Sequence, residues 1–297
     1  MTPMPDTPAL SFSPVVAGAW RLAEWGWTID QRLAWIEGLL ARGIHSFDHA
    51  DIYGGYTVEA LFGEALSGRP ALRDQLQLVS KCGIQLVTPA RPGNAIKHYD
   101  TSAAHVRASV EHSLRALRTD RLDLLLIHRP DHLLEADALA ETFASLRQAG
   151  KVLHFGVSNF TPAQFELLNS RVPLVTNQVE CSLLHLAPLD DGTLDQAQRL
   201  RCRPMIWSPL AGGRLFGEDS PAAHRVRWVM GEIGARLGCS ATTLALAWLM
   251  RHPSRPVPVI GSRRLEAADE ALAATRLVLD AQDWYRLWSA STGREVA

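Results

Sequence analysis

Residues 150–170, GKVLHFGVSNFTPAQFELLNS, contain one complete transition from strand to helix. The apolar run at 152–157 is typical of a buried strand. The tetrapeptide TPAQ at 161–164 has the pattern of a helix start, with Thr161 as the N-cap, proline in the first helical position and Gln164 as the capping-box partner. The stretch therefore predicts a strand that is followed directly by a helix.

The same alternation recurs along the whole chain, where short runs rich in Val, Ile and Leu are separated by longer segments of helical period. Eight strands are predicted, at 15–19, 44–47, 76–80, 123–127, 152–157, 174–179, 204–208 and 257–260. No linker rich in Gly, Ser or Pro divides the chain. We therefore expect an α/β fold with one (β/α)8 TIM barrel domain over 1–297, in which about 1–10 form a loose N-terminal segment. A doubly wound sheet with a helical second domain is the alternative.

Two more of the helices between these strands have recognisable starts. Thr28 is expected to cap a helix over about 29–42. A second helix is expected between 101 and 117, with Asp100 or Thr101 as its cap.

Composition excludes several classes of partner. The 30 Lys and Arg residues balance 31 Asp and Glu residues, for a net charge of −1, so no basic surface for nucleic acid or an anionic membrane is expected. The four cysteines form no C-x-x-C pair, which favours a reduced, cytoplasmic protein. The chain has no apolar stretch long enough to span a membrane and no leader pattern. We expect a cytoplasmic protein with a small-molecule partner.

Polar residues stand at the ends of three consecutive predicted strands. Asp48 and Tyr53 follow the second strand in FDHADIYGG, Lys81 follows the third in SKCG, and His128 follows the fourth in LLIHRP. A TIM barrel carries its chemistry at the carboxyl ends of its strands. The four side chains are therefore expected to meet at one mouth of the barrel.

Together these groups could polarise and protonate a carbonyl. The Tyr53 phenol, with an ordinary pKa of about 10, becomes a useful acid if the Lys81 ammonium lowers that pKa. Asp48 would keep Lys81 charged and oriented, and His128 could donate a second hydrogen bond to the substrate oxygen. Each residue alone would fit a structural role, such as a buried ion pair, but the four together favour catalysis.

A metal site is the weaker alternative for this region. His45 and His49 are four residues apart, close to Asp48 and Asp51. A strand does not place such a pair on one face as a helix does, and no H-E-x-x-H pattern is present. No metal is therefore expected.

Seven motifs, which together span most of the sequence, follow one another along the chain: GAWRL, FDHADIYG, LLLIHRP, GKVLHFGVSNF, TNQVE, WSPLAGGRL and VIGS. In this order they resemble the motifs of the aldo-keto reductase superfamily, closest to a bacterial subfamily of predicted oxidoreductases. The resemblance implies that Asp48, Tyr53, Lys81 and His128 form the catalytic tetrad. It also implies a nicotinamide cofactor bound without a Rossmann fold, and no G-x-G-x-x-G follows a predicted strand here.

The resemblance assigns cofactor contacts residue by residue. It places Ser158, Asn159 and Gln178 on the nicotinamide carboxamide and Trp207 on the nicotinamide ring. The full set of implied cofactor-binding residues is Gly18, Ala19, Trp20, Ser158, Asn159, Gln178, Trp207, Ser208, Pro209, Leu210, Gly212, Gly213, Arg214, Gly261, Ser262, Arg263, Arg264 and Glu270. Trp20 could also wall the substrate pocket.

The sequence departs from the family near the adenosine end of the cofactor. Arg263 and Arg264 precede a predicted helix and could hold a 2′-phosphate. Ala267 stands where many members have Arg or Gln, and Ala271 where Asn is usual, although the acidic Glu270 is retained. The family resemblance and the two arginines favour NADPH as the cofactor, and the alanines at these two positions make NADH the alternative.

The resemblance thus implies an NAD(P)H-dependent reductase that converts an aldehyde or ketone to an alcohol, with Tyr53 as the proton donor. A nucleotide-sensing regulatory module with little turnover is the alternative. The physiological substrate, the preferred direction and the oligomeric state stay open.

Overall fold

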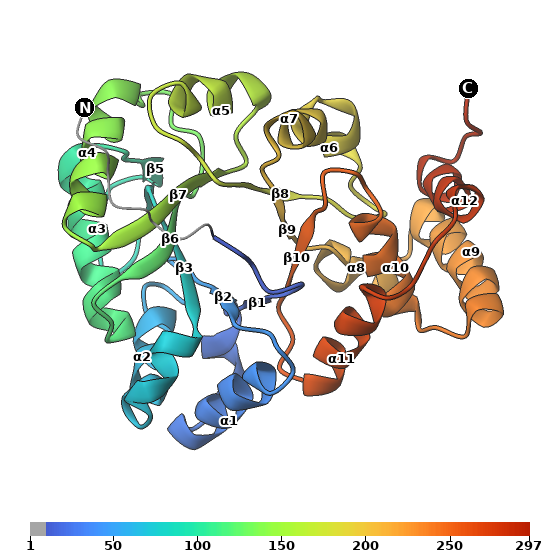
Figure 1. Ribbon diagram of the computed structural model, residues 1–297, viewed down its shortest axis with the longest axis horizontal. Helices are drawn as coiled ribbons and strands as arrows, with labels where there is room; N and C mark the ends of the chain where they lie inside the picture. The colour runs from blue at the N-terminus through green and yellow to red at the C-terminus, as the bar shows by residue number, and fades with distance from the viewer. Residues whose placement is uncertain (1–9) are drawn as a thin grey trace. The chain divides into compact units, whose positions relative to one another are not determined.

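The structure, a computed structural model, describes residues 10–297 (Figure 1). Its eight main strands form a closed barrel in the order β1-β10-β9-β8-β7-β6-β3-β2, which confirms the expected (β/α)8 fold. These strands are β1 Val16–Gly18, β2 Ser46–Asp48, β3 Gln77–Cys82, β6 Leu122–Ile127, β7 Val152–Ser158, β8 Asn177–Glu180, β9 Met205–Trp207 and β10 Val257–Ile260. All eight overlap the predicted strands. Of the segment 1–10 that was expected to be loose, all but Leu10 lies outside the described residues.

Helices alternate with the strands. The α-helices are α1 Ile29–Leu40, α2 Val58–Ser67, α3 Ala103–Leu117, α4 Ala136–Gln148, α5 Pro162–Asn169, α6 Ala187–Asp190, α7 Thr193–Leu200, α8 Arg214–Gly217, α9 Pro221–Leu237, α10 Ala241–Met250, α11 Leu265–Ala274 and α12 Ala281–Thr292. Short 3-10 helices are η1 Leu22–Trp25, η2 Pro70–Gln75 and η3 Ala211–Gly213. A small antiparallel hairpin, β4 Ile84–Gln85 with β5 His98–Tyr99, and the C-terminal helix α12 were not predicted.

The helix starts test the capping arguments. Thr28 forms the predicted capping box, and so does Thr161, whose side chain accepts from the amide of Gln164. The predicted cap of α3 is wrong. Ser102, not Asp100 or Thr101, caps that helix, because the Thr101 hydroxyl instead donates to Asp131 at 2.8 Å.

The chain divides into two compact units, Ala17–Asn177 with the segment ending at Ser13, and Gln178–Ala297 with Pro14–Val16. In the first unit, α2 and α3 pack against each other beside β3 (Figure 1). Gly63 permits this contact, because a Cβ there would lie 2.1 Å from the carbonyl oxygen of Ala116.

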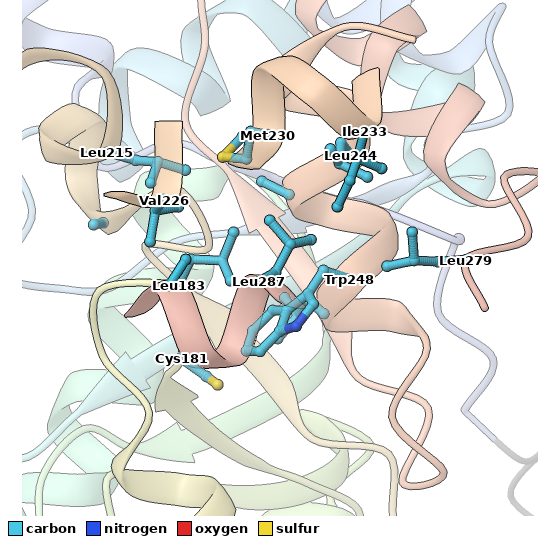
Figure 2. Packing of buried hydrophobic residues seen from close by; sticks show 14 of the residues in the cluster. Cys181, Leu183, Leu215, Val226, Met230, Ile233, Leu244, Trp248, Leu279 and Leu287 are labelled. Carbon is cyan, nitrogen blue, oxygen red and sulfur yellow. The ribbon is translucent and has the colours of Figure 1, made fainter. Parts of the chain in front are cut away.

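The second unit has its own apolar core, to which α8, α9, α10 and α12 contribute (Figure 2). Trp248 of α10 and Trp284 of α12 stack with ring centroids 5.1 Å apart. Each indole N–H donates to the main-chain carbonyl of the other residue, at 3.1 and 3.0 Å. The buried indole of Trp248 therefore gains apolar burial without leaving its donor unsatisfied.

Within residues 10–297, no helix on its own combines the length and apolar character needed to cross a membrane. The pair α9 and α10 meets the length and composition criteria only when both helices are taken together, and it is bent by 95°.

Replacing Trp248 with Ala tests the core of the second unit. We expect the variant Trp248→Ala to lower the free energy of unfolding by about 3–5 kcal/mol, because it leaves a large cavity and removes the reciprocal contact. Trp228→Ala is the control, since Trp228 is 74% exposed, and it should change stability by no more than about 0.5 kcal/mol. Urea denaturation followed by circular dichroism measures both, and equal effects would contradict the role given to Trp248.

Candidate active site

The first unit brings together the four residues of the predicted tetrad. Asp48 ends β2, Lys81 lies near the end of β3, and His128 follows β6 directly. Parallel pairing aligns these strand ends, because β3 and β6 pair at Lys81 with Leu126, and the amide of His128 donates to the carbonyl of Cys82 at 2.9 Å. The fourth residue, Tyr53, lies in the turn between β2 and α2.

Lys81 is the centre of this group. Its ammonium donates to both carboxylate oxygens of Asp48, at 2.8 and 2.7 Å, and to the carbonyl of His49 at 2.8 Å. It also donates to the hydroxyl oxygen of Tyr53 at 3.0 Å. Lys81 and Asp48 are almost completely buried, so the ion pair is shielded from solvent. Burial alone would lower the pKa of Lys81, but the contacts with Asp48 and Tyr53 outweigh it and raise that pKa.

The pKa of Tyr53 shifts in the opposite direction to the one expected from the sequence. Burial of the phenol raises its pKa above 10, and this effect outweighs the lowering by the Lys81 ammonium. The sequence identified the charged neighbour but not the loss of solvent around the phenol. Tyr53 therefore holds its proton firmly at neutral pH.

His128 faces Tyr53, with ring centroids 5.9 Å apart and the rings edge to face. Burial, followed by the charge of Lys81, lowers the pKa of His128 well below its usual value, so the imidazole is neutral. Its Nδ1 is buried and has no hydrogen-bond partner among the described residues. A neutral imidazole can donate one hydrogen bond without adding positive charge beside Lys81.

The turn after Tyr53 has an unusual backbone. Gly54, Gly55 and Tyr56 follow with φ of 59°, 64° and 74°, a left-handed run that favours glycine. The carbonyl of Tyr53 accepts from the amides of Thr57 and Val58, which joins the turn to the start of α2. At Gly54 a side chain would also be crowded, because a Cβ there would lie 2.7 Å from the Thr57 hydroxyl oxygen.

Two buried carboxyl groups behind the tetrad were not predicted as functional. Asp51 accepts a hydrogen bond from Ser109 of α3 at 2.8 Å, and Glu59 of α2 accepts one from Ser80 at 2.5 Å. Burial raises the pKa of each carboxyl to about 7. An acidic residue inside an apolar helical run such as VEALFG is the signal that could have identified Glu59.

His45 and His49, which were considered as metal ligands, lie in separate surroundings. His49 is fully buried with its ring 4.4 Å from that of Phe62, and burial lowers its pKa to about 3. His45 lies within 3.3 Å of the carbonyl of Ser11. Residues 10–297 contain no group of three or more His, Cys, Asp or Glu side chains that could hold a metal ion.

The first unit also carries five of the expected cofactor residues at strand ends. Gly18 ends β1, Ala19 is buried, and Trp20 is 55% exposed. Ser158 ends β7, and Asn159 beside it takes a left-handed φ of 60° and donates from its amide to the Ser158 hydroxyl at 2.8 Å. The side chains of Ser158 and Asn159 are thus hydrogen-bonded to each other at the end of β7.

The second unit supplies Gln178, in β8, and Trp207, which ends β9 and is half-buried. After Trp207 comes the segment Ser208, Pro209, Leu210, Ala211, Gly212, Gly213 and Arg214. Within it Ser208, Ala211, Gly212 and Gly213 have φ between 48° and 98°. Left-handed residues in a short loop can turn backbone N–H groups to one side, as in phosphate-binding loops, although the amides of Ala211 and Gly213 already donate to the carbonyls of Ser208 and Leu210. Arg214 adds a guanidinium, although it already pairs with Glu218 at 3.2 Å.

The residues after β10 lead into α11. Gly261 and Ser262 precede Arg263 and Arg264, both exposed, and Arg264 is the N-cap residue without a side-chain cap. The Ser262 hydroxyl accepts from the amide of Arg264 at 3.1 Å. A helix start with exposed guanidinium groups fits the phosphates of a dinucleotide.

Within α11, Glu270 is half-buried, and its carbonyl accepts a hydrogen bond from Thr243 at 3.0 Å. Ala271 is fully buried, so this position packs inside the unit. The donors at the loop and helix starts therefore fit a nicotinamide dinucleotide, while Ala271 offers it no contact.

Comparisons with known proteins agree with this chemistry. The model of the Aldo/keto reductase family matches residues 14–291, a range that includes all four tetrad positions. The Escherichia coli oxidoreductase YdhF is 50% identical over 289 residues, which cover 96% of this chain and 95% of YdhF. The 6-dehydroglucose reductase of Agrobacterium fabrum is 45% identical over 291 residues, or 97% of each chain.

Solved structures share the fold. A thermostable aldo-keto reductase crystallised with the inhibitor epalrestat has a TM-score of 0.76 at 25% identity, covering 93% of this chain and 94% of that one. The glycerol dehydrogenase of Gluconobacter oxydans has a TM-score of 0.85 at 23% identity, covering 98% of this chain and 96% of that one.

The buried carboxyl of Glu59 should make stability depend on pH. Its pKa is about 7 in the folded state and 4.5 without burial, so between these values the folded chain holds a proton that the unfolded chain releases. Stability contributed by this group is present below pH 4.5 and lost as the pH rises towards 7. Glu59→Gln removes the ionisation, so relative to the wild type it should gain about 1–3 kcal/mol between pH 5 and pH 8.

Glu64→Gln is the control, since Glu64 lies on the same helix with its side chain 40% exposed. Urea denaturation of all three proteins at both pH values gives the comparison. An equal gain in stability in both variants, or no gain in Glu59→Gln, would contradict the raised pKa of Glu59.

Proposed function

Because the chain belongs to the aldo/keto reductase family and is an NAD(P)H-dependent oxidoreductase, we propose that it reduces the carbonyl of an aldehyde or ketone with Tyr53 as the proton donor. The observation that carries this proposal is the 3.0 Å contact from the Lys81 ammonium to the Tyr53 hydroxyl oxygen. We further propose that the whole chain acts as one catalytic domain in the cytoplasm. All four cysteines are free thiols, in keeping with a reducing compartment.

The hydroxyl proton of Tyr53 is available to an acceptor on the side away from Lys81. Because Lys81 donates to the phenol oxygen, the hydroxyl proton is left to point at another acceptor. The raised pKa keeps that proton in place until a stronger base is present. An alkoxide developing on the substrate is such a base, and the Lys81 ammonium stabilises the phenolate that remains.

His128 supports the same oxygen. As a neutral imidazole edge to face with Tyr53, it can donate a hydrogen bond to the substrate oxygen. Two donors aimed at one oxygen polarise the carbonyl and stabilise negative charge as it develops there. Asp48 forms an ion pair with Lys81, and its role is to keep the ammonium charged and oriented.

When bound, the reduced nicotinamide supplies the hydride. We assign Ser158, Asn159 and Gln178 to the carboxamide and Trp207 to the nicotinamide ring. The left-handed loop at 208–214 would hold the diphosphate. The two exposed arginines before α11 favour NADPH over NADH, because a 2′-phosphate adds charge that guanidinium groups bind well.

The name of the Agrobacterium fabrum relative suggests a first substrate class. That relative is a 6-dehydroglucose reductase, and it is similar to this chain over almost its full length. We therefore propose oxidised sugars as the first carbonyl compounds to assay. Simple aromatic and aliphatic aldehydes should be assayed beside them.

Tyr53→Phe tests the proton donor. The variant keeps the ring but removes the hydroxyl, so we expect kcat for carbonyl reduction to fall by at least about 100-fold. The affinity for NADPH, followed by tryptophan fluorescence, should stay within about threefold. Full turnover in the variant would refute the assignment, and tight NADPH binding without turnover in the wild type would favour the nucleotide-sensing module instead.

Arg264→Ala tests the cofactor preference. If the Arg264 guanidinium contacts the 2′-phosphate, the Kd for NADPH should rise about tenfold while the Kd for NADH changes little. Arg276→Ala is the control, because Arg276 is exposed beyond the other end of α11. Equal weakening of both nucleotides by Arg264→Ala would argue against this contact.

A further inference from the structure

We propose that Asp51 is a positioning residue, which holds the segment between β2 and α2 so that the Tyr53 hydroxyl stays against the Lys81 ammonium. The expected loss of activity in Asp51 variants rests on the proposed reductase function. The expected change in the surroundings of the Tyr53 phenol does not. Asp51 touches none of the tetrad side chains in a hydrogen bond, so it acts through the chain that carries Tyr53.

The main chain before Tyr53 is joined to β3 at two points. The amide of His49 donates to the carbonyl of Val79 at 2.8 Å, and the amide of Asp51 donates to the carbonyl of Lys81 at 3.0 Å. The backbone of Asp51 is therefore bonded to the residue whose side chain bonds Tyr53. A shift of Asp51 would move the phenol and the ammonium relative to each other.

The side chain of Asp51 supplies a third point of attachment. Its carboxyl accepts from the hydroxyl of Ser109, which belongs to α3, at 2.8 Å. Both residues are buried, with 3% and 5% of their surfaces exposed, so water does not compete for the contact. The contact ties the segment to a helix that the main-chain bonds do not reach.

On the other side of Tyr53, Glu59 makes a similar contact. It lies in the first turn of α2 and accepts from Ser80, the neighbour of Lys81 in β3, at 2.5 Å. Between these two acid–serine contacts lies the left-handed run that starts at Gly54. Glycine has the largest conformational freedom of any residue, so the two side-chain contacts add to the hydrogen bonds that the Tyr53 carbonyl accepts from Thr57 and Val58. The position of Tyr53 then depends on the attachments at both ends.

The charged and titratable groups around the Asp51 carboxyl come from several elements. They are Glu59 of α2, Cys82 of β3, and Arg91 of the loop between β4 and β5. A carboxyl in these surroundings carries its proton over much of the neutral range. Asparagine has nearly the same shape and also accepts from a serine hydroxyl, so it is the conservative replacement.

The test compares Asp51→Ala, Asp51→Asn and the control Asp123→Asn. Asp123 is also an acid that anchors β3, since it accepts from the amide of Leu78 at 2.8 Å, but at the other end of the strand. We expect Asp51→Ala to lower kcat for carbonyl reduction about 10- to 100-fold, because small displacements of reacting groups cost that much. The Kd for NADPH should stay within about twofold. Asp51→Asn should keep most of the activity, and Asp123→Asn should keep kcat.

A second readout does not need turnover. The chain has four tyrosines, so subtracting the alkaline ultraviolet titration of Tyr53→Phe from that of the wild type isolates Tyr53. The same subtraction is made for Asp51→Ala and for Asp123→Asn, with Tyr53→Phe added to each variant. The pKa of Tyr53 should move towards about 10 in Asp51→Ala, because a loosened phenol regains water, and should not move in Asp123→Asn. If Asp51→Ala does not fold, Ser109→Ala removes the same contact and should shift the titration in the same direction.

An unchanged kcat and an unchanged Tyr53 titration in Asp51→Ala would overturn the proposal. Equal losses in Asp51→Ala and Asp123→Asn would also overturn it, because they would indicate general destabilisation. A wild type without carbonyl reduction would refute the proposed function alone, and the titration would still decide the role of Asp51.

Discussion

The buried ion pair between Lys81 and Asp48 is the interaction on which the rest of the site depends. An ammonium in the interior is tolerated only with close acceptors, and Lys81 has four oxygens within 3.0 Å. Removing Asp48 would leave an uncompensated buried charge, a change that typically costs about 3–5 kcal/mol. The pair therefore anchors two strand ends and fixes the atom around which Tyr53 and His128 are arranged.

Burial, together with the charge of Lys81, sets the protonation of the neighbouring groups. The charge helps to keep His128 neutral, and it opposes, without cancelling, the effect of burial on Tyr53. The result is a site with one buried ion pair, between Lys81 and Asp48, and two neutral groups that can donate to an oxygen. This division suits a reaction in which negative charge appears on a carbonyl oxygen and is then removed by a proton.

The sequence predicted the features that depend on local pattern. Apolar runs located all eight barrel strands, and T-P-A-Q located the start of α5, because both signals are contained in a few adjacent residues. The cap of α3 was wrong because three capping residues stand in a row, and a tertiary contact to Asp131 decides among them. The tetrad was predicted because strand order brings its members together. The pKa of Tyr53 and the roles of Asp51 and Glu59 depend on burial, which adjacent residues do not specify.

The close contact at Gly63 has a consequence for how this enzyme can change over generations. No side chain fits there unless the end of α3 moves, since the carbonyl of Ala116 occupies the space. α3 also carries Ser109, the partner of Asp51. A mutation at Gly63 would thus disturb packing and the surroundings of Tyr53 in one step. A larger residue at position 63 therefore requires a compensating change in α3 that moves the Ala116 carbonyl away.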